Sequence, residues 1–228
     1  MTLGLEGKQV VITGGDGALG VAVVAAFTAA GAGCHLPVFG PGGGSDSSPG
    51  VRVTGKIDLT DETAVTGYFA DLPPLWASVH LAGGYAAKPI TDTSRADLDR
   101  QLALNLVTSF LCCREAVKAM RKSGGGRIVN VAARVVDIPI GGAVAYSVSK
   151  AGVAALTRSL AVETRGDGIL VNAILPSIID TPANRAAMPK ADPARWPKPD
   201  ELARAILWLA SPENRITTGA LVPVYGAA

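Results

Sequence analysis

The chain opens with a strand, a glycine-rich turn and a helix in direct succession. Residues Lys8–Thr13 are predicted to form a short apolar strand, and Val21–Ala30 an apolar helix. Between them, Gly15, Gly17 and Gly20 have the spacing G-x-G-x-x-G. Glycines permit a tight turn with close backbone approach, and a helix N-terminus presents free N–H groups to a pyrophosphate. The opening therefore favours a dinucleotide-binding fold over a plain structural turn.

Strands and helices alternate along the rest of the chain. Further apolar strands are predicted at Cys34–Phe39, Val51–Asp58, Ala77–Ala82, Arg127–Ala132, Leu170–Leu175 and Leu221–Tyr225. Helices are predicted after the capping pattern Asp58–Asp61 and over Leu98–Lys122, Tyr146–Glu163 and Asp200–Ser211. This alternation, without an internal linker, predicts one α/β domain over residues 1–228. The expected architecture is a Rossmann-type, doubly wound parallel sheet of about seven strands with helices on both faces, and ligands at the carboxyl ends of the strands.

The charge balance argues against two classes of partner. Lys and Arg number 21 and Asp and Glu 19, a net charge of +2, which gives no electrostatic case for nucleic acid or a membrane surface. The three cysteines contain no C-x-x-C pair and form no cluster with the two histidines. They are therefore expected to be reduced, buried thiols, and no metal site is expected. Without a signal sequence or a transmembrane-length apolar run, we expect a cytoplasmic protein that acts on a small molecule.

The second crossover departs from the usual strand–helix pattern. Residues Gly40–Gly50 are of low complexity and predict a helix-free, mobile loop. The end of the preceding strand is where an acidic residue would bind the ribose hydroxyls of NAD, or a basic one the 2′-phosphate of NADP. Val38, Phe39 and Gly40 are neutral there. The sequence therefore does not choose between NAD and NADP.

Tyr146 and Lys150 are the leading candidates for chemistry. A spacing of four places both side chains on one face of the predicted helix, one turn apart. A nearby ammonium favours the phenolate, which would let Tyr146 give or take a proton nearer neutral pH. The alternative is that both residues lie on the solvent face of the helix. Asn105, inside the long predicted helix, is similarly either a functional residue or a satisfied interior polar residue.

Together these motifs resemble those of the short-chain dehydrogenase/reductase family across essentially the whole chain. The motifs that carry the resemblance are Thr13–Gly20, Asp58–Leu59, Leu81–Gly84, Asn105, Tyr146 with Lys150, and Pro176–Thr181. The resemblance implies an NAD(P)-dependent oxidoreductase in which Tyr146 is the general acid/base. Lys150 would lower the pKa of Tyr146 and hold the nicotinamide ribose, and Asn105 would position a water that connects Lys150 to solvent.

The resemblance also assigns residues to the two ligands. Besides Tyr146 and Lys150, the cofactor would contact Gly14, Asp16, Gly17, Ala18, Leu19, Gly20, Val38, Phe39, Asp58, Leu59, Leu81, Ala82, Gly83, Gly84, Pro176, Ile179 and Thr181. Residues 176–199 would cover the substrate, whose expected neighbours are Ala133, Arg134, Asp137, Asn184, Arg185, Met188 and Trp196. Because family members usually pair their two long helices with a symmetry mate, a homodimer or homotetramer is expected.

One position departs from the family pattern. The catalytic serine, expected thirteen residues before the tyrosine, is Ala133. An alanine cannot hydrogen-bond a carbonyl oxygen, so alcohol or ketone chemistry loses one of its two partners at that oxygen. The dihydropteridine reductases of this family also carry alanine here, and they resemble this chain in the glycine-rich opening and in Asp180–Trp196. A quinonoid, imine or conjugated acceptor is therefore expected, because it needs hydride at one atom and a proton at another.

Two alternatives stay open. The chain could be a carbonyl or alcohol dehydrogenase that uses Tyr146 without the serine. It could also be a cofactor-binding sensor or scaffold without turnover, which Ala133 and the neutral end of the second strand would suit. The joint presence of Asn105, Tyr146 and Lys150 argues against a sensor, because a protein that only binds needs no proton relay.

Overall fold

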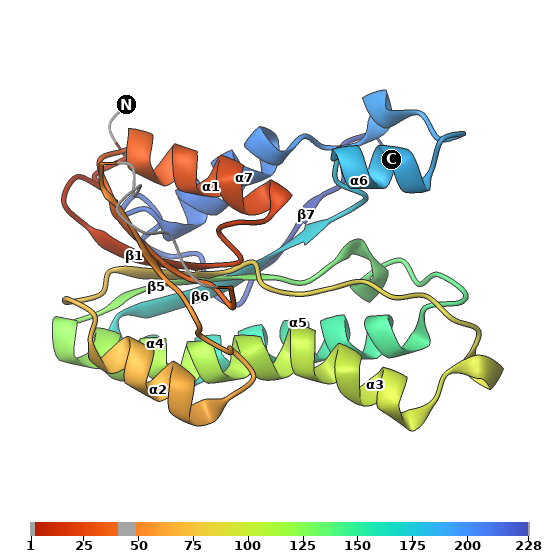
Figure 1. The fold of residues 1–228 in the computed structure, drawn as a ribbon. Helices are drawn as coiled ribbons and strands as arrows, with labels where there is room; N and C mark the ends of the chain where they lie inside the picture. Colours follow the sequence, from red (N-terminus) through yellow and green to blue (C-terminus); the bar gives the residue numbers. More distant parts are fainter. Residues whose placement is uncertain (1–2, 41–48, 228) are drawn as a thin grey trace.

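Seven parallel strands form a single sheet in the computed structural model, which describes residues 3–40 and 49–227 (Figure 1). The strands are β1 Gln9–Thr13, β2 Gly33–Pro37, β3 Val51–Thr54, β4 Ala77–His80, β5 Gly126–Val131, β6 Ile169–Pro176 and β7 Leu221–Val224. Their order across the sheet is β3-β2-β1-β4-β5-β6-β7. This confirms the predicted doubly wound sheet. The strand order reverses between β1 and β4, so a ligand crevice is expected where these two strands end.

Helices cover both faces of the sheet. They are α1 Ala18–Ala29, α2 Glu62–Ala70, α3 Arg95–Gln101, α4 Thr108–Ser123, α5 Val144–Glu163, α6 Pro182–Ala187 and α7 Pro199–Ala210. In Figure 1, α1 and α7 lie above the sheet, and α2, α4 and α5 lie below it. Helices on both faces bury the strands, which explains the near-continuous apolar runs in their sequences. None of the helices in the described part of the chain is long and apolar enough to span a membrane.

The side chains of β1 alternate between two layers of the core. Val10 and Ile12 point to one face, where they belong to the same buried cluster as Phe27 of α1 and Ile206 of α7. Val11 points to the other face. It belongs to a second buried cluster, which includes residues of α2, α4, β5 and β6. The two layers hold the sheet between its helices. The three cysteines, all within the described residues, are buried and free, as the sequence predicted.

The predicted helix Leu98–Lys122 is not one regular helix. It begins earlier, at Arg95, behind a side-chain capping box. α3 then passes into a π-helical turn, Leu102–Val107, before α4 begins. Asn105 lies in this π turn, and turns of this kind are frequent at functional sites. Apolar spacing near 3.6 could not reveal the extra residue in the turn.

Other predicted boundaries differ by a few residues. α1 and α5 begin earlier than predicted, at Ala18 and Val144. The strand predicted to reach Asp58 ends at Thr54. Lys56 adopts a left-handed backbone conformation with a φ of 61°, which is incompatible with a continuing strand.

The sequence also predicted the turn before α2 and the form of the second crossover. The pattern Asp58–Asp61 does precede a helix, and its cap is Asp61, whose carboxylate accepts a hydrogen bond from the Ala64 N–H at 3.0 Å. The predicted helix-free, mobile loop falls mainly on residues 41–48, which lie outside the described residues.

Candidate active site

The glycine-rich turn lies between the end of β1 and the start of α1. Gly14 has a φ of 65°, and a Cβ on it would lie 2.9 Å from the Ala82 nitrogen, so only glycine fits there. Gly17 directly precedes α1, and no side chain of the described residues caps this helix. The first N–H groups of α1 are therefore available to a pyrophosphate, which fits a dinucleotide cofactor. The other predicted residues of this region lie in the same turn or the first turn of α1: Asp16, Ala18, Leu19 and Gly20.

Two predicted cofactor residues follow β2 at the carboxyl edge of the sheet. The Phe39 side chain is 76% exposed, so its ring is available to a flat ligand such as adenine. Val38 is half-buried beside it. Asp58 is also half-buried, and its Oδ1 accepts hydrogen bonds from the Thr60 N–H at 2.8 Å and hydroxyl at 2.7 Å. These bonds fix the orientation of the Asp58 carboxylate, in the turn that also contains Leu59.

Lys56 was not singled out in the sequence, yet it lies at this same strand end. Its N–H donates to the Gly40 carbonyl at 2.8 Å, and the neighbouring Ile57 N–H donates to the Val38 carbonyl at 3.0 Å. The Lys56 side chain is exposed. The backbone of a basic residue is therefore hydrogen-bonded next to a strand end whose own residues are neutral. The sequence hid this because Lys56 follows β3 rather than β2.

The residues after β4 run alongside the glycine-rich turn. The N–H groups of Leu81 and Ala82 donate to the Thr13 carbonyl and hydroxyl, each at 3.2 Å. A Cβ on Gly83 would lie 2.5 Å from Asn105 Oδ1 and 3.5 Å from Lys150 Nζ. Gly83 therefore has to be glycine, and it is the point where the predicted cofactor segment meets two predicted catalytic residues.

Asn105 is fully buried, and its side chain hydrogen-bonds the backbone of Gly84, the residue after Gly83. Its Oδ1 accepts from the Gly84 N–H, and its Nδ2 donates to the Gly84 carbonyl, each at 3.0 Å. Nδ2 also lies 3.1 Å from Ser149 Oγ and 3.3 Å from Gln101 Oε1. Ser149 in turn donates to the Tyr146 carbonyl at 2.7 Å. Asn105 is thus a satisfied buried residue, and it lies at the candidate site.

Lys150 is buried beneath the crevice. Its Nζ donates to the Val131 carbonyl at 2.8 Å, which leaves further N–H donors for ribose hydroxyls. Burial lowers the pKa of the Lys150 ammonium to about 8. The Lys150 ammonium therefore lies next to Gly83, where the resemblance implies that the cofactor binds.

Tyr146 is half-buried, and its proton is held more tightly than predicted. Burial, with a smaller contribution from the neighbouring Tyr85, raises the pKa of Tyr146 to about 12. The prediction that Lys150 lowers this pKa is therefore not met in the protein alone. The physical reason is that desolvation disfavours the phenolate, and the nearby Tyr85 adds to the rise.

Tyr85 is an aromatic neighbour of Tyr146 that sequence reasoning missed. Their ring centroids lie 4.9 Å apart with an interplanar angle of 82°, an edge-to-face pair. Tyr85 is 62% exposed. Its only sequence signal was its position directly after the glycines that follow β4.

A buried polar network lies under the crevice. His80 Nδ1 and Asn130 Oδ1 are 2.8 Å apart, as are His80 Nε2 and Ser78 Oγ. Asn130 Nδ2 donates to Thr157 Oγ1 at 2.9 Å. Asn130 Oδ1 must therefore accept from Nδ1, and Nε2 accepts from Ser78. Burial lowers the pKa of His80 to about 4, so the imidazole is neutral at pH 7.

The loop after β5 holds three predicted substrate neighbours. Ala133 is buried and precedes a short 3₁₀ turn at 134–136. The Arg134 guanidinium lies 5.3 Å from the centroid of the Tyr225 ring, and the Tyr225 hydroxyl donates to Asp137 Oδ2 at 3.0 Å. Tyr225 was missed as a site residue, although its position just after the last strand brings it to the same edge of the sheet.

The covering segment is held largely by its own polar contacts. Arg185 makes two hydrogen bonds to the Asp180 carboxylate, at 2.6 and 2.8 Å. Asn184 Nδ2 donates to the Ile179 carbonyl at 2.8 Å, and the Thr181 hydroxyl accepts from the Asn184 N–H at 3.2 Å. The Asn184 amide nitrogen and one edge of the Arg185 guanidinium, both predicted beside the substrate, are therefore already partnered within the segment.

Trp196 and Met188 differ in how much surface they offer. Trp196 was expected beside the substrate, but it is only 6% exposed, so its indole has little surface left for a ligand. Met188 is half-buried at the end of α6. Pro176, the last residue of β6, is buried. Within this segment, Met188 is the predicted neighbour with both apolar surface and partial exposure.

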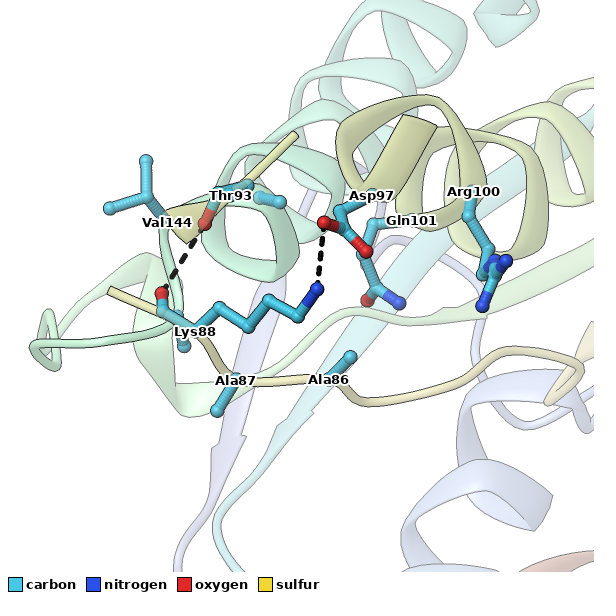
Figure 2. A pocket seen from close by; sticks show the side chains of 10 residues that line it. Ala86, Ala87, Lys88, Thr93, Asp97, Arg100, Gln101 and Val144 are labelled. Atoms are coloured by element: carbon cyan, nitrogen blue, oxygen red, sulfur yellow. Dashed lines mark hydrogen bonds and ion pairs between the residues drawn. The ribbon is translucent and has the colours of Figure 1, made fainter. Parts of the chain in front are cut away.

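A cavity of about 80 Å³ is lined in part by the residues that follow Tyr85 in the chain (Figure 2). Its walls are Ala86–Lys88, α3 residues including Asp97 and Gln101, and Ala143–Ala145 at the start of α5. Lys88 Nζ and Asp97 Oδ2 are 2.9 Å apart across it. Because Gln101 touches both this cavity and Asn105, the cavity gives water a place next to the candidate proton relay.

Comparison with known proteins gives consistent matches along the whole chain. Residues 16–226 match the family model described as enoyl-(acyl carrier protein) reductase. The D-threitol dehydrogenase of Mycolicibacterium smegmatis is 30% identical, over 97% of this chain and 93% of the relative. The galactitol 2-dehydrogenase of Rhizobium johnstonii is 34% identical, over 96% and 94%. A solved structure described as a short-chain dehydrogenase/reductase family protein superposes with a TM-score of 0.88 at 27% identity, covering 99% of this chain and 98% of the other.

Proposed function

This chain belongs to the short-chain dehydrogenase/reductase family and is an NAD(P)-dependent oxidoreductase, and we propose that it reduces a quinonoid, imine or otherwise conjugated acceptor. The observation that carries the proposal is Ala133. A ketone oxygen in this position would have a single hydroxyl partner, Tyr146, for its developing charge. A conjugated acceptor spreads that charge and takes its proton at a nitrogen or a conjugated oxygen, which one donor can serve.

The residues of the crevice suit the binding of the cofactor. The uncapped start of α1 would hold the pyrophosphate, the exposed Phe39 ring would pack on adenine, and Lys150 would bind the ribose. Bound there, the reduced nicotinamide supplies hydride. Asn105 would keep Gly83 and Gly84 in place against it.

Tyr146 suits the role of acid in the reductive direction. With a pKa of about 12 it is a neutral phenol at pH 7, so it holds the proton that the acceptor needs. Lys150, with a pKa of about 8, would return a proton to the phenolate, and water in the cavity beside Gln101 would resupply Lys150. The net reaction consumes one hydride and one proton for each acceptor reduced.

A second candidate is a carbonyl or alcohol dehydrogenase that uses Tyr146 alone. The relatives named above favour it, because they are dehydrogenases of threitol and galactitol. The case for the conjugated acceptor rests instead on the sequence, in which Ala133 and the glycine-rich opening resemble those of dihydropteridine reductases. The two candidate functions differ in the class of substrate, whereas proton transfer by Tyr146 is common to both.

We also propose that residues 1–228 form one domain that pairs with a second copy through α4 and α5. Leu104, Val107 and Phe110 lie at a spacing of three along the π turn and the start of α4, and all are exposed. Val148 is exposed on α5. An apolar stripe of this kind on two neighbouring helices suits a homodimer or homotetramer.

The test measures the oxidation of NADH and NADPH by a matched set of acceptors. The absorbance of the reduced nicotinamide reports the rate. The set holds quinonoid dihydropterin, a quinone-imine dye, cyclohexanone and a polyol-derived ketose. Turnover with the first two that depends on Tyr146 would support the proposal. Turnover only with cyclohexanone or the ketose would establish the second candidate. Tight cofactor binding with no turnover of any acceptor would overturn both.

A further inference from the structure

The edge-to-face pair of Tyr85 and Tyr146 leaves one aromatic ring open to a ligand. Tyr146 is half-buried in α5, whereas Tyr85 is 62% exposed. Within residues 3–40 and 49–227, the Tyr85 hydroxyl has no hydrogen-bond partner. An exposed aromatic side chain in direct contact with the expected proton donor is a surface that a substrate must meet.

The backbone around Tyr85 is fixed at both ends rather than left as a free loop. On one side, Asn105 makes its two hydrogen bonds to Gly84. On the other, Lys88 forms a parallel β-bridge with Ala143, just before α5, and its Nζ reaches Asp97 (Figure 2). The backbone position of Tyr85 is therefore set by the fold before any ligand arrives, and the ring packs edge-to-face on Tyr146, which lowers the ordering cost of binding against it.

A fixed, exposed ring discriminates between ligand shapes. A flat conjugated ring can stack on it or meet it edge-on, whereas a puckered aliphatic ring or an open polyol makes fewer contacts. Ala133 offers no hydroxyl on the other side of the reacting group that would orient a ketone oxygen. Orientation by an aromatic surface is the alternative that this site provides.

We propose that Tyr85 contacts the substrate and determines specificity, selecting planar, conjugated acceptors and orienting them toward Tyr146. This inference rests on the proposed function. The reduced nicotinamide gives the acceptor a hydride, Tyr146 gives it a proton, and the acceptor gains two electrons while the cofactor is oxidised. Tyr85 itself is unchanged and acts through its ring.

The test compares Tyr85→Phe, Tyr85→Leu and Tyr85→Ala in the holoenzyme, with Ile216→Ala as the control at an exposed position distant in sequence from the site. kcat and KM are measured for 2,6-dichlorophenolindophenol, a planar quinone imine, and for cyclohexanone. Phenylalanine keeps the ring and should leave the dye KM within about two-fold of wild type. Alanine should raise the dye KM about ten-fold, the loss of one stacking contact, with little change for cyclohexanone.

A binding measurement separates recognition from chemistry. The oxidised dye is titrated by calorimetry into enzyme saturated with the oxidised cofactor, a pair that cannot react. The dye affinity should fall about ten-fold in Tyr85→Ala and less in Tyr85→Leu, which retains bulk and keeps the test valid if alanine unfolds the loop.

Each outcome bears on one of the two claims. If the wild type reduces the dye but Tyr85→Ala and Tyr85→Leu keep the same dye-to-cyclohexanone ratio of kcat/KM, the role of Tyr85 is overturned and the proposed function stands. If the wild type reduces cyclohexanone but neither binds nor reduces the dye, the proposed acceptor class is overturned. An equal fall in kcat for both acceptors would mean that Tyr85 only supports Tyr146, which also contradicts the inference.

Discussion

The Asn105 carboxamide pairs with both backbone groups of Gly84, accepting from its N–H and donating to its carbonyl at 3.0 Å each. Just past the end of β4, the side-chain amide thus satisfies the backbone hydrogen bonds that a neighbouring strand would otherwise make. The pairing joins the π turn to the segment that carries Gly83 and Tyr85. It explains why a polar residue is tolerated at zero exposure in this helix.

Replacing Asn105 by alanine should therefore cost stability as well as activity. The partly buried N–H and carbonyl of Gly84 would lose their partners, and the free energy of unfolding should fall by about 2 kcal/mol. Urea unfolding at neutral pH measures this. Ser149→Ala is the control, because it removes one contact of Asn105 and leaves the pairing with Gly84 intact. Equal stability of the two variants would contradict the role given to Asn105.

Tyr146→Phe should lower kcat by about 10²–10⁴-fold while the affinity for NADH or NADPH stays within a few-fold, because only the proton donor is removed. Stopped-flow turnover and fluorescence titration of the cofactor give the two numbers. Tyr68→Phe is the matched control: its buried hydroxyl has no partner among the described residues, so its removal should leave both turnover and stability unharmed. Full activity in Tyr146→Phe would remove Tyr146 from the mechanism.

Restoring the family serine offers a gain-of-function test. Ala133→Ser should raise kcat/KM for cyclohexanone by about ten-fold or more, because a ketone oxygen would regain its second hydrogen-bond donor. The conjugated dye should change little. The readout is the ratio of the two values of kcat/KM in variant and wild type. An unchanged ratio would mean that the missing hydroxyl does not decide the acceptor class.

Acid should destabilise the protein through His80. Its folded pKa of about 4 lies below the unfolded value of 6.5, so the unfolded state binds more protons between these pH values. The stabilisation is complete above pH 6.5 and is lost as the pH falls toward 4, by up to about 1.4 kcal/mol per pH unit. Thermal unfolding across this range measures the slope. His80→Gln should reduce this slope of stability against pH by the contribution of about one proton. His35, whose pKa burial also lowers, contributes in the same direction, so His35→Gln is the comparison.

Lys56 should bias the enzyme toward NADPH. Its N–H bonds the Gly40 carbonyl just past the end of β2, so its exposed side chain starts next to the place where a 2′-phosphate would lie. Lys56→Gly should weaken NADPH binding about ten-fold without weakening NADH. Because glycine accepts a positive φ, the same change should raise stability by about 1 kcal/mol. Arg52→Met, at the exposed position of β3, is the charge-matched control. Equal losses for the two cofactors would reject the assignment.

The sheet was the part of this molecule most open to prediction. Its strands are short apolar runs bounded by glycine and polar residues. Such runs can be recognised from the sequence, because strand formation depends mainly on the local preferences of the residues and on their burial. Tyr146, Lys150 and Asn105 could be proposed from spacing and order. Tyr85 and Tyr225 could not, because each gains its meaning from a contact with a residue far away along the chain. Trp196 was misjudged for the same reason, since its burial depends on packing that no local pattern reports.

The π turn Leu102–Val107 also sets the rotational phase between α3 and α4. One residue beyond an α-helical turn rotates the next helix by about 100° around the common axis. This rotation lets Gln101 face the cavity behind Ala86 while Cys113 and Ala116 face the sheet. Deleting any one residue of the turn would restore a regular helix and swing α3 out of register with Lys88, even where the deleted side chain touches nothing. The length of this segment is therefore as constrained as its composition.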